Sequence, residues 1–206
     1  MNINKNYILK AIQELGFKEY TEIQNKVIPK ALKGIDIIGC SQTGSGKTHA
    51  FLIPIFENLD VDVHDVQVLI TAPTRELAEQ IYKNARQLAS HSENKIDIRK
   101  YVGGSNREKE VERLKKSQPQ IIIGTPGKIN DLATKDRAFG LAFFTFIGSL
   151  TIRLPQLEPE TINHFTYFAV LKIMDPRTCQ NNKIIVSHLM LIQAERLTNN
   201  TFYTIS

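Results

Sequence analysis

The chain has 206 residues, with 26 lysines and arginines, 21 acidic residues and two cysteines. This length suits one large domain with an ample core, and it excludes two complete nucleotide-binding lobes. The net charge of +5 favours a polyanionic partner, although a generic solvated surface would carry the same excess. Cys40 and Cys179 lie far apart with no Cys/His cluster beside them. Neither a zinc site nor a disulfide framework is therefore predicted, and the reducing cytoplasm is the expected location.

No segment is typical of a secretory leader or a membrane span. Lys5, Lys10 and Glu14 interrupt the apolar residues of the N-terminus. The longest uncharged run lies between Arg137 and Arg153 and has 15 residues, fewer than the roughly 20 that a spanning helix needs. We expect its phenylalanines to lie in a core or on an exposed apolar surface, and we expect no membrane partner.

Hydrophobic periodicity predicts two helices and then an alternation of strands and helices. The first helix is expected over residues 4–15, closed by Gly16, and the second from Thr21 to Gly34. Expected strands follow at 35–39, 66–72, 96–102 and 121–124, and the helices after them at 46–58, 75–90, 106–116 and 126–134. This alternation, with continuous Val/Ile/Leu runs, predicts an α/β fold: a mostly parallel sheet with helices on both faces. In such sheets the ligand binds beyond the carboxyl ends of the strands.

The composition changes near residue 139. Of the first 138 residues 38 are charged, but only 9 of the last 68 are, and the helical pattern also fades there. We therefore expect a domain over residues 1–138, followed by an atypical tail over residues 139–206.

Residues 41–48 read Ser-Gln-Thr-Gly-Ser-Gly-Lys-Thr and stand between an expected strand and an expected helix. A polyphosphate needs many N–H donors and a close approach of the backbone, which Gly44 and Gly46 permit. Lys47 supplies a mobile charge for the β- and γ-phosphates, and the hydroxyl of Thr48 can reach a Mg²⁺ ion. The alternative is an ordinary turn rich in small residues, which the strand and helix on either side disfavour.

The candidate nucleotide site follows from this loop. The general pattern begins with Gly, where this chain has Ser41. Lys47 is the candidate catalytic residue and Thr48 the candidate metal ligand. The loop residues expected to hold the phosphates are Ser41, Gln42, Thr43, Gly44, Ser45, Gly46, Lys47 and Thr48.

Upstream of the loop, Gln24 offers both an amide donor and an acceptor, the pair that reads the N6 and N7 edge of adenine. The segment Thr21–Gln24 also matches a capping box, in which Thr21 caps the helix and Gln24 reaches back to it. Taken alone, the capping role is favoured. The two roles are compatible, because a capped helix would hold the amide in place.

Short segments follow the next three expected strands: Pro73–Leu77, Gly103-Gly104 and Thr125–Gly127. Because the carboxyl ends of parallel strands meet at one edge of a sheet, all three are expected on the same edge. Individually each segment is ordinary turn and helix-cap chemistry.

These segments also carry groups that suit phosphates. Thr74 and Thr125 are candidate N-caps, and Pro126 suits a first helical turn, so the N–H groups of those turns can take anions. Arg75 adds a fixed cation with a forked set of donors.

In this order the segments resemble the DEAD-box ATP-dependent RNA helicases, and specifically the first of their two RecA-like domains, over about residues 8–137. Phe17 and Gln24 are similar to the adenine-reading Q motif, residues 41–48 to the Walker A loop, and the three later segments to motifs Ia, GG and Ib. The resemblance implies ATP and Mg²⁺ as cofactors and RNA as the partner. We expect the chain to be a monomer. The contacts to RNA would be independent of sequence and sensitive to salt. The implied RNA-binding residues are Pro73, Thr74, Arg75, Gly103, Gly104, Thr125, Pro126 and Gly127.

Several features depart from the family pattern. Tyr20 replaces the usual Pro of the Q motif, Ser41 stands where the family has Ala, and the chain begins too late for the upstream aromatic that stacks on adenine. No Asp-Glu-Ala-Asp or Ser-Ala-Thr follows Thr125, and no second domain is present. In P-loop ATPases an acidic residue of this motif holds Mg²⁺ together with the loop hydroxyl. Its absence therefore removes a metal ligand that ATP hydrolysis needs.

The tail offers weak substitutes for these motifs. Residues 168–175 could form a strand ending in the acid Asp175, although an Asp-Pro turn is favoured there. Residues 183–188 are strand-like and place Ser187 near their end. The histidines, at positions 49, 64, 91, 164 and 188, lack metal-ligand spacing and are expected to be surface or satisfied polar residues.

A strand is also expected to be missing from the sheet. Without the strand of the acidic motif, residues 35–40 or their neighbours lose a partner, and segments 139–152 or 166–174 are apolar enough to fill the gap. Loose docking of the tail is expected.

Two functional hypotheses remain. The first is a helicase lobe that binds ATP and RNA. The second is a non-enzymatic nucleotide- and RNA-binding remnant, in which an altered reading frame or a rearranged gene replaced everything from about residue 139.

Overall fold

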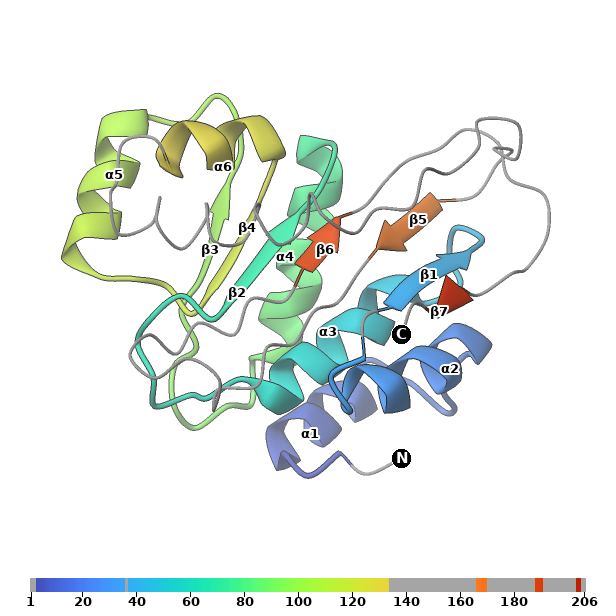
Figure 1. Cartoon of the computed structure of the whole chain (residues 1–206). Coiled ribbons are helices and arrows are strands. Elements are labelled where there is room, and N and C mark those ends of the chain that lie inside the picture. Colours follow the sequence, from blue (N-terminus) through green and yellow to red (C-terminus); the bar gives the residue numbers. More distant parts are fainter. Residues whose placement is uncertain (1–2, 36, 134–165, 170–187, 191–202, 205–206) are drawn as a thin grey trace, which may run out of the picture.

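The computed structural model of the chain describes residues 3–35, 37–133, 166–169, 188–190 and 203–204. Two helices, α1 (Asn6–Glu14) and α2 (Glu22–Ala31), come before the first strand (Figure 1). Strands and helices then alternate as β1 (Ile37–Ser41), α3 (Lys47–Asn58), β2 (Val68–Thr71), α4 (Arg75–Leu88), β3 (Ile98–Tyr101), α5 (Arg107–Lys116), β4 (Ile121–Gly124) and α6 (Pro126–Ala133). Three short strands follow: β5 (Thr166–Ala169), β6 (His188–Met190) and β7 (Tyr203–Thr204).

All these strands join one sheet in the order β3-β4-β2-β6-β5-β1-β7. The pairs β3/β4, β4/β2 and β2/β6 are parallel, whereas β5 is antiparallel to both β6 and β1, and β7 is antiparallel to β1. Two reversals between β6 and β1 cancel, so β1 runs in the same direction as β2, β3 and β4. The carboxyl ends of these four strands therefore share one edge of the sheet (Figure 1).

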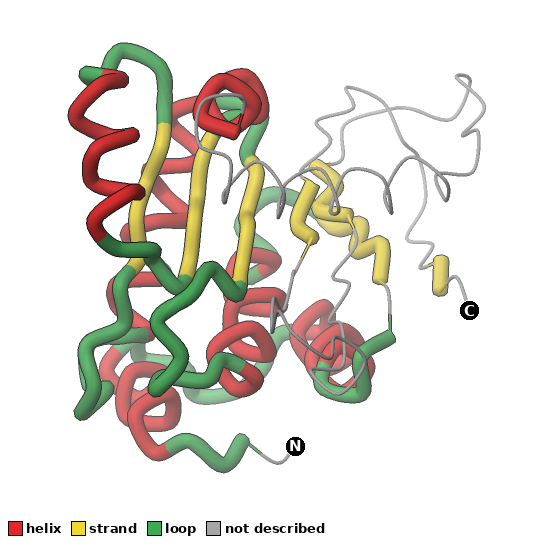
Figure 2. Tube along the Cα trace, turned by 60° about the vertical axis from the view of Figure 1, so that its left-hand side comes forward, coloured by secondary structure: helices red, strands yellow, loops and turns green. Residues whose placement is uncertain are grey.

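The helices cover both faces of the sheet because apolar side chains alternate along the strands. Val68 and Ile70 belong to the core cluster that includes α1, α2, α3 and α4. Leu69, between them, belongs to a second cluster with residues of α5 and α6. Figure 2 shows the strands with helices on either side. The predicted α/β fold, with a mostly parallel sheet covered on both faces, is confirmed.

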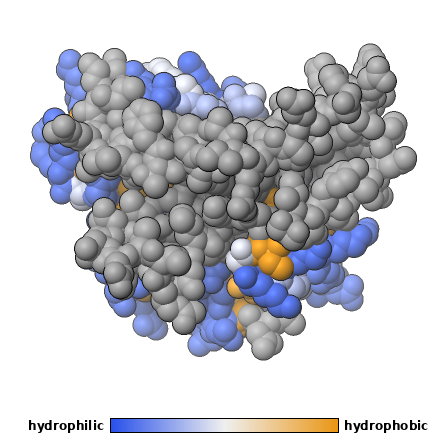
Figure 3. All heavy atoms as spheres, viewed as in Figure 1, coloured by the Kyte–Doolittle hydropathy of each residue, from blue (hydrophilic) through white to orange (hydrophobic). Residues whose placement is uncertain are grey.

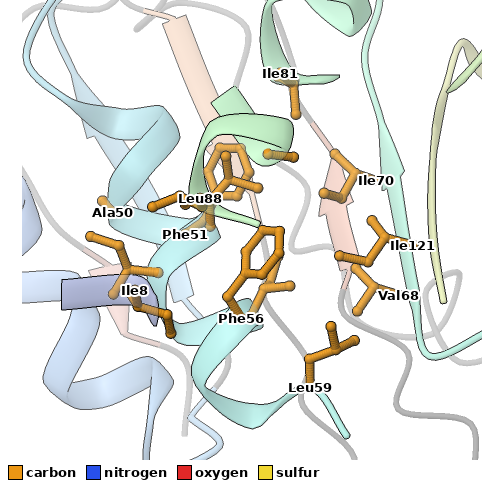
Figure 4. Packing of buried hydrophobic residues seen from close by; sticks show 14 of the residues in the cluster. Ile8, Ala50, Phe51, Phe56, Leu59, Val68, Ile70, Ile81, Leu88 and Ile121 are labelled. Carbon is orange, nitrogen blue, oxygen red and sulfur yellow. The ribbon is translucent and has the colours of Figure 1, made fainter. Parts of the chain in front are cut away.

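Helix α3 lies deep in the larger core cluster. Residues Ala50 to Phe56 are all buried, because α3 packs between α2 and α4 beside the sheet. Phe51 and Phe56 contribute the largest side chains to this core (Figure 4), and burying one such side chain stabilises a fold by about 1.5–3 kcal/mol. The helix that follows the phosphate loop is thus firmly anchored.

The first strand begins two residues later than predicted. The strand expected over 35–39 is observed at Ile37–Ser41, and α2 ends at Ala31. Gly34 has a positive φ of 76°, and the N–H of Ile35 donates to the carbonyl of Lys30 (3.2 Å). Ile35 thereby completes the hydrogen bonding of the α2 terminus and is not part of the strand. Ser41 is accordingly the last residue of β1.

Segments from beyond residue 138 lie between β1 and β2. A strand was expected over residues 168–175, and β5 (Thr166–Ala169) overlaps the first two of these residues. A strand was also expected over residues 183–188, and β6 (His188–Met190) overlaps its last residue. Ala169 pairs with Ile38, and His188 with Leu69. Part of the segment 166–174 thus fills the expected gap. Asp175, Ser187 and residues 139–152 lie outside the described residues.

The described surface is largely polar. Hydrophilic residues predominate over α5 and α2 in Figure 3, and among the described residues Leu9 is the exposed large hydrophobic side chain. No helix within the described ranges has the length and apolarity to cross a bilayer.

Candidate functional site

The phosphate loop joins the end of β1 to the first residue of α3. Gly44 and Gly46 have φ values of 81° and 88°, in the left-handed region that favours glycine. The ammonium of Lys47 donates to the carbonyl of Ser41 (2.6 Å) and to that of Gln42. Lys47 therefore reaches back across the loop, at the place where the sequence predicts bound phosphates.

Gln24 connects the start of α2 to this loop. Its side chain is buried, its Oε1 accepts from the N–H of Thr21 (3.0 Å), and its Nε2 donates to the carbonyl of Gly46 (3.1 Å). The predicted capping box is confirmed. Adenine recognition by Gln24 remains a prediction, and it requires the amide to exchange these partners for the base.

The contact between Gln24 and Gly46 leaves no room for a side chain on the loop. A Cβ at position 46 would lie 2.6 Å from Gln24 Nε2 and 3.0 Å from Thr21 Oγ1. Gly46 is therefore required both by its positive φ and by the approach of Gln24.

Phe17 contacts α3 at His49, in the first turn of that helix. Its ring lies 4.9 Å from that of His49, between centroids, and the rings are inclined by 79°. Nε2 of His49 is buried and has no hydrogen-bond partner within the described ranges. The prediction that His49 is a surface or satisfied polar residue is therefore wrong, because the Phe17 segment covers the first turn of α3. Burial lowers the pKa of His49, so its ring is neutral at pH 7.

The segments after β2 and β3 contact each other through Arg75. Thr74 is the N-cap of α4, as predicted, and its Oγ1 accepts from the N–H of Leu77 (3.2 Å). The Arg75 guanidinium lies against Gly103, where a Cβ would come within 2.7 Å of Nη2. Gly104 has a φ of 94°. The structure thus brings together two of the candidate RNA-binding segments.

The third segment follows β4, the strand paired with β3. The N–H of Thr125 donates to the carbonyl of Tyr101 (3.1 Å), which holds this segment beside the end of β3. Pro126 is the first residue of α6, as the sequence predicts. Pro126 and Gly127 are exposed.

One ion pair beside this segment was not predicted. Lys128 Nζ lies 2.7 Å from Glu110 Oε2, and the two side chains are only 9% and 13% exposed. The pair joins α5 to α6, so Lys128 is committed to Glu110 rather than to solvent. No local signal reveals the pair, because its members stand far apart in the sequence on different helices.

The described residues fit the phosphates of a nucleotide better than they fit a resident metal ion. The loop provides backbone N–H groups, a lysine and the start of a helix. Thr48 provides one hydroxyl oxygen, but no group of three or more His, Cys, Asp or Glu residues that could hold a metal ion occurs in the described part of the chain. A Mg²⁺ ion would thus depend mainly on ligands from the nucleotide.

Comparisons with known proteins agree on one family. The model of the DEAD/DEAH box helicase family matches residues 21–147. The DEAD-box ATP-dependent RNA helicase CshB of Listeria monocytogenes is 50% identical over 133 residues, which are 65% of this chain and 30% of that protein. CshB of Bacillus cereus is 44% identical over 137 residues, 66% of this chain and 31% of that protein.

Solved structures give the same result. The crystal structure of a DEAD box protein from Methanococcus jannaschii superposes with a TM-score of 0.59 at 34% identity, covering 66% of this chain and 36% of that one. A hypothetical ATP-dependent RNA helicase from Sulfolobus tokodaii gives a TM-score of 0.54 at 33% identity, covering 64% and 37%. The chain spans about a third of the length of the relatives it matches.

Proposed function

Because the chain belongs to the DEAD/DEAH box helicase family, we propose that its α/β domain binds ATP at residues 41–48 and the backbone of single-stranded RNA at the neighbouring strand ends. The observation that carries this proposal is the contact between Gln24 and Gly46, which joins a candidate base-reading side chain to the phosphate loop (3.1 Å). An ordinary turn of small residues would have no such connection.

ATP binding would begin with Lys47. On arrival of the β- and γ-phosphates its ammonium would leave the carbonyls of Ser41 and Gln42 and pair with the phosphate oxygens. The positive φ of Gly44 and Gly46 lets the loop backbone approach the same anion closely. Mg²⁺ bound with the nucleotide would neutralise phosphate charge, with the Thr48 hydroxyl as its protein ligand.

The adenine base would bind against the segment of residues 16–24. Gln24 would turn its amide from Thr21 and Gly46 toward the N6 and N7 edge of the base. Phe17 would supply an aromatic surface for the ring. Release of the Gly46 carbonyl would couple base recognition to the loop that holds the phosphates.

RNA would bind along the shared edge of β2, β3 and β4. Arg75, held against Gly103, is the cation of this surface, and the N–H groups that follow Thr74 and Thr125 are further phosphate donors. Such contacts recognise the backbone and not the base sequence. Because they pair positive groups with phosphates, binding would weaken as the salt concentration rises.

The nucleotide proposal is tested by equilibrium titration of the purified chain with ATP. Lys47→Ala should abolish measurable binding. Because Lys47 also donates to the carbonyls of Ser41 and Gln42, thermal unfolding without ligand is measured to confirm that the variant is folded. Unchanged affinity in Lys47→Ala would overturn the assignment of the phosphate site.

The RNA proposal is tested by fluorescence anisotropy with a single-stranded oligonucleotide at several salt concentrations. Replacing Arg75 by Gln should reduce the slope of log K against log salt by about 0.7, the value for one phosphate contact in a single strand. Arg86→Gln is the matched control, because Arg86 is exposed in the last turn of the same helix, away from the strand ends. Equal slopes in the two variants would exclude a phosphate contact by Arg75.

A second candidate function is nucleotide and RNA binding without hydrolysis. It is favoured by the absence of Asp-Glu-Ala-Asp from the 206 residues, because that acidic motif supplies the metal and water ligands of the reaction. Steady-state ATP hydrolysis with saturating RNA separates the two functions. We expect no turnover above that of Lys47→Ala, and no ATP-dependent unwinding, by this chain.

Two further properties stay proposals. A cytoplasmic location is supported by two cysteines without a partner pattern. A monomer is supported by the described residues, among which Leu9 is the exposed large hydrophobic side chain. Sedimentation of the purified chain tests the second.

A further inference from the structure

His49 contacts an aromatic side chain of the segment that precedes α2. It lies in the first turn of α3, next to Thr48 of the phosphate loop, and its ring makes an edge-type contact with Phe17 (4.9 Å, 79°). Nε2 is buried without a hydrogen-bond partner in the described part of the chain. A buried polar atom without a partner costs stability, so the contribution of the ring and that of its nitrogen must be tested separately.

The geometry of the pair suits a contact between aromatic rings. The inclination of 79° matches the edge-to-face arrangement that aromatic pairs prefer.

Besides this contact, the hydrogen bond from Gln24 to Gly46 also joins residues 16–24 to the start of α3. A segment held at one point can pivot about it, whereas two points three residues apart on the loop and helix fix its orientation. Phe17 contacts the first turn of α3 at His49, and Gln24 contacts the residue before the helix, Gly46.

We propose that His49 is a positioning residue for the base: its ring holds Phe17 in place beside the phosphate loop, and so transmits the geometry of the loop to the base-binding segment. This inference rests on the proposed ATP site. It makes His49 a determinant of affinity for the base and not of affinity for the phosphates, although His49 is a neighbour of Thr48 in the sequence.

The test is a double-mutant cycle read with two ligands. Wild type, Phe17→Ala, His49→Ala and the double variant are titrated with ADP, which carries the base, and with inorganic tripolyphosphate, which does not. His49→Ala should weaken ADP binding about two- to twelvefold, the range supported by an aromatic pair, and leave tripolyphosphate binding unchanged. In the Phe17→Ala background the same substitution should have no further effect on ADP.

A fourth variant separates the contribution of the ring from that of its nitrogen. His49→Phe keeps an aromatic ring and removes Nε2, so it should bind ADP as the wild type does. If His49→Phe binds ADP as weakly as His49→Ala does, the Nε2 atom and not the ring determines the affinity for ADP. If His49→Ala weakens both ligands equally, the residue only supports the loop. Either result overturns the inference.

Failure of the inference is distinguishable from failure of the proposed function. A wild-type chain that binds neither ADP nor tripolyphosphate removes the nucleotide site itself, and the inference with it. A wild-type chain that binds both, with His49→Ala unchanged toward ADP, removes only the role of His49. Thermal unfolding of each variant without ligand confirms that the compared proteins are folded.

Discussion

Replacing Gly46 by Ala tests the connection between the phosphate loop and α2. The new methyl group would lie 2.6 Å from Gln24 Nε2 and 3.0 Å from Thr21 Oγ1, at a φ of 88°. The variant must therefore accept a strained backbone and also displace the amide of Gln24.

The two costs can be estimated separately. A Cβ in the left-handed region costs about 1–2 kcal/mol. Displacement of the amide removes the bond from Gln24 to the Gly46 carbonyl, which is worth about 0.5–1.5 kcal/mol. We expect Gly46→Ala to lower the free energy of unfolding by about 2–3 kcal/mol.

Gly44→Ala is the matched control, because Gly44 has a φ of 81° and nothing within 4 Å of its Cβ position. It should carry the backbone cost alone. Urea unfolding followed by circular dichroism should give Gly46→Ala a midpoint about 0.2–1.5 M below that of Gly44→Ala, for a difference of about 0.5–1.5 kcal/mol and an m-value of about 1–3 kcal/mol/M.

A third measurement isolates Gln24. In a Gln24→Ala background the nearest obstacle is gone and Thr21 Oγ1 (3.0 Å) remains, so the excess cost of Gly46→Ala over Gly44→Ala should become smaller. Equal midpoints for Gly46→Ala and Gly44→Ala in the wild-type background would refute the reasoning, because the contact with Gln24 would then have no energetic consequence.

Three further predictions concern RNA, pH and the N-terminus. Gly103→Ala should displace the Arg75 guanidinium (2.7 Å) and weaken RNA binding several-fold by anisotropy, yet add nothing in an Arg75→Gln background. Because burial lowers the folded-state pKa of His49, the folded chain binds fewer protons than the unfolded chain below the ordinary value of 6.5. The stability due to neutral His49 should thus be complete above that pH and decline below it. His49→Phe should lack this part of the decline in urea titrations between about pH 5 and 7.5. Lys5 donates to two carbonyls at the end of α3, so Lys5→Met should lower the free energy of unfolding by about 1–2 kcal/mol, whereas Lys10→Met, at an exposed position of α1, should not.

The sequence predicts the local parts of this fold well because local chemistry decides them. Thr74 caps α4 and the glycines of the loop adopt positive φ, as expected from residue type alone. The start of β1 was misplaced because the N–H of Ile35 is used by the end of α2, a competition that hydrophobic runs do not reveal. Strand order was beyond prediction, since pairings such as Ile38 with Ala169 join residues far apart in the chain.

In the candidate site, too, local sequence predicts some features and packing between distant segments decides the others. The phosphate loop and the capping role of Gln24 follow from short patterns, whereas the bond from Gln24 to Gly46 depends on how α2 packs along α3. The Phe17–His49 contact depends on the same packing. A single histidine among apolar helix residues gave no indication of its partner.

The most direct test of the account is calorimetric titration of the purified chain with ATP and GTP. Gln24 should read the adenine edge once its amide leaves Gly46, and a bidentate contact of this kind distinguishes bases by about 1–3 kcal/mol. We therefore predict that ATP binds at least about fivefold more tightly than GTP, and that Lys47→Ala binds neither. Equal affinities of the wild-type chain for ATP and GTP would contradict the role of Gln24 and, with it, the link between base and phosphate recognition.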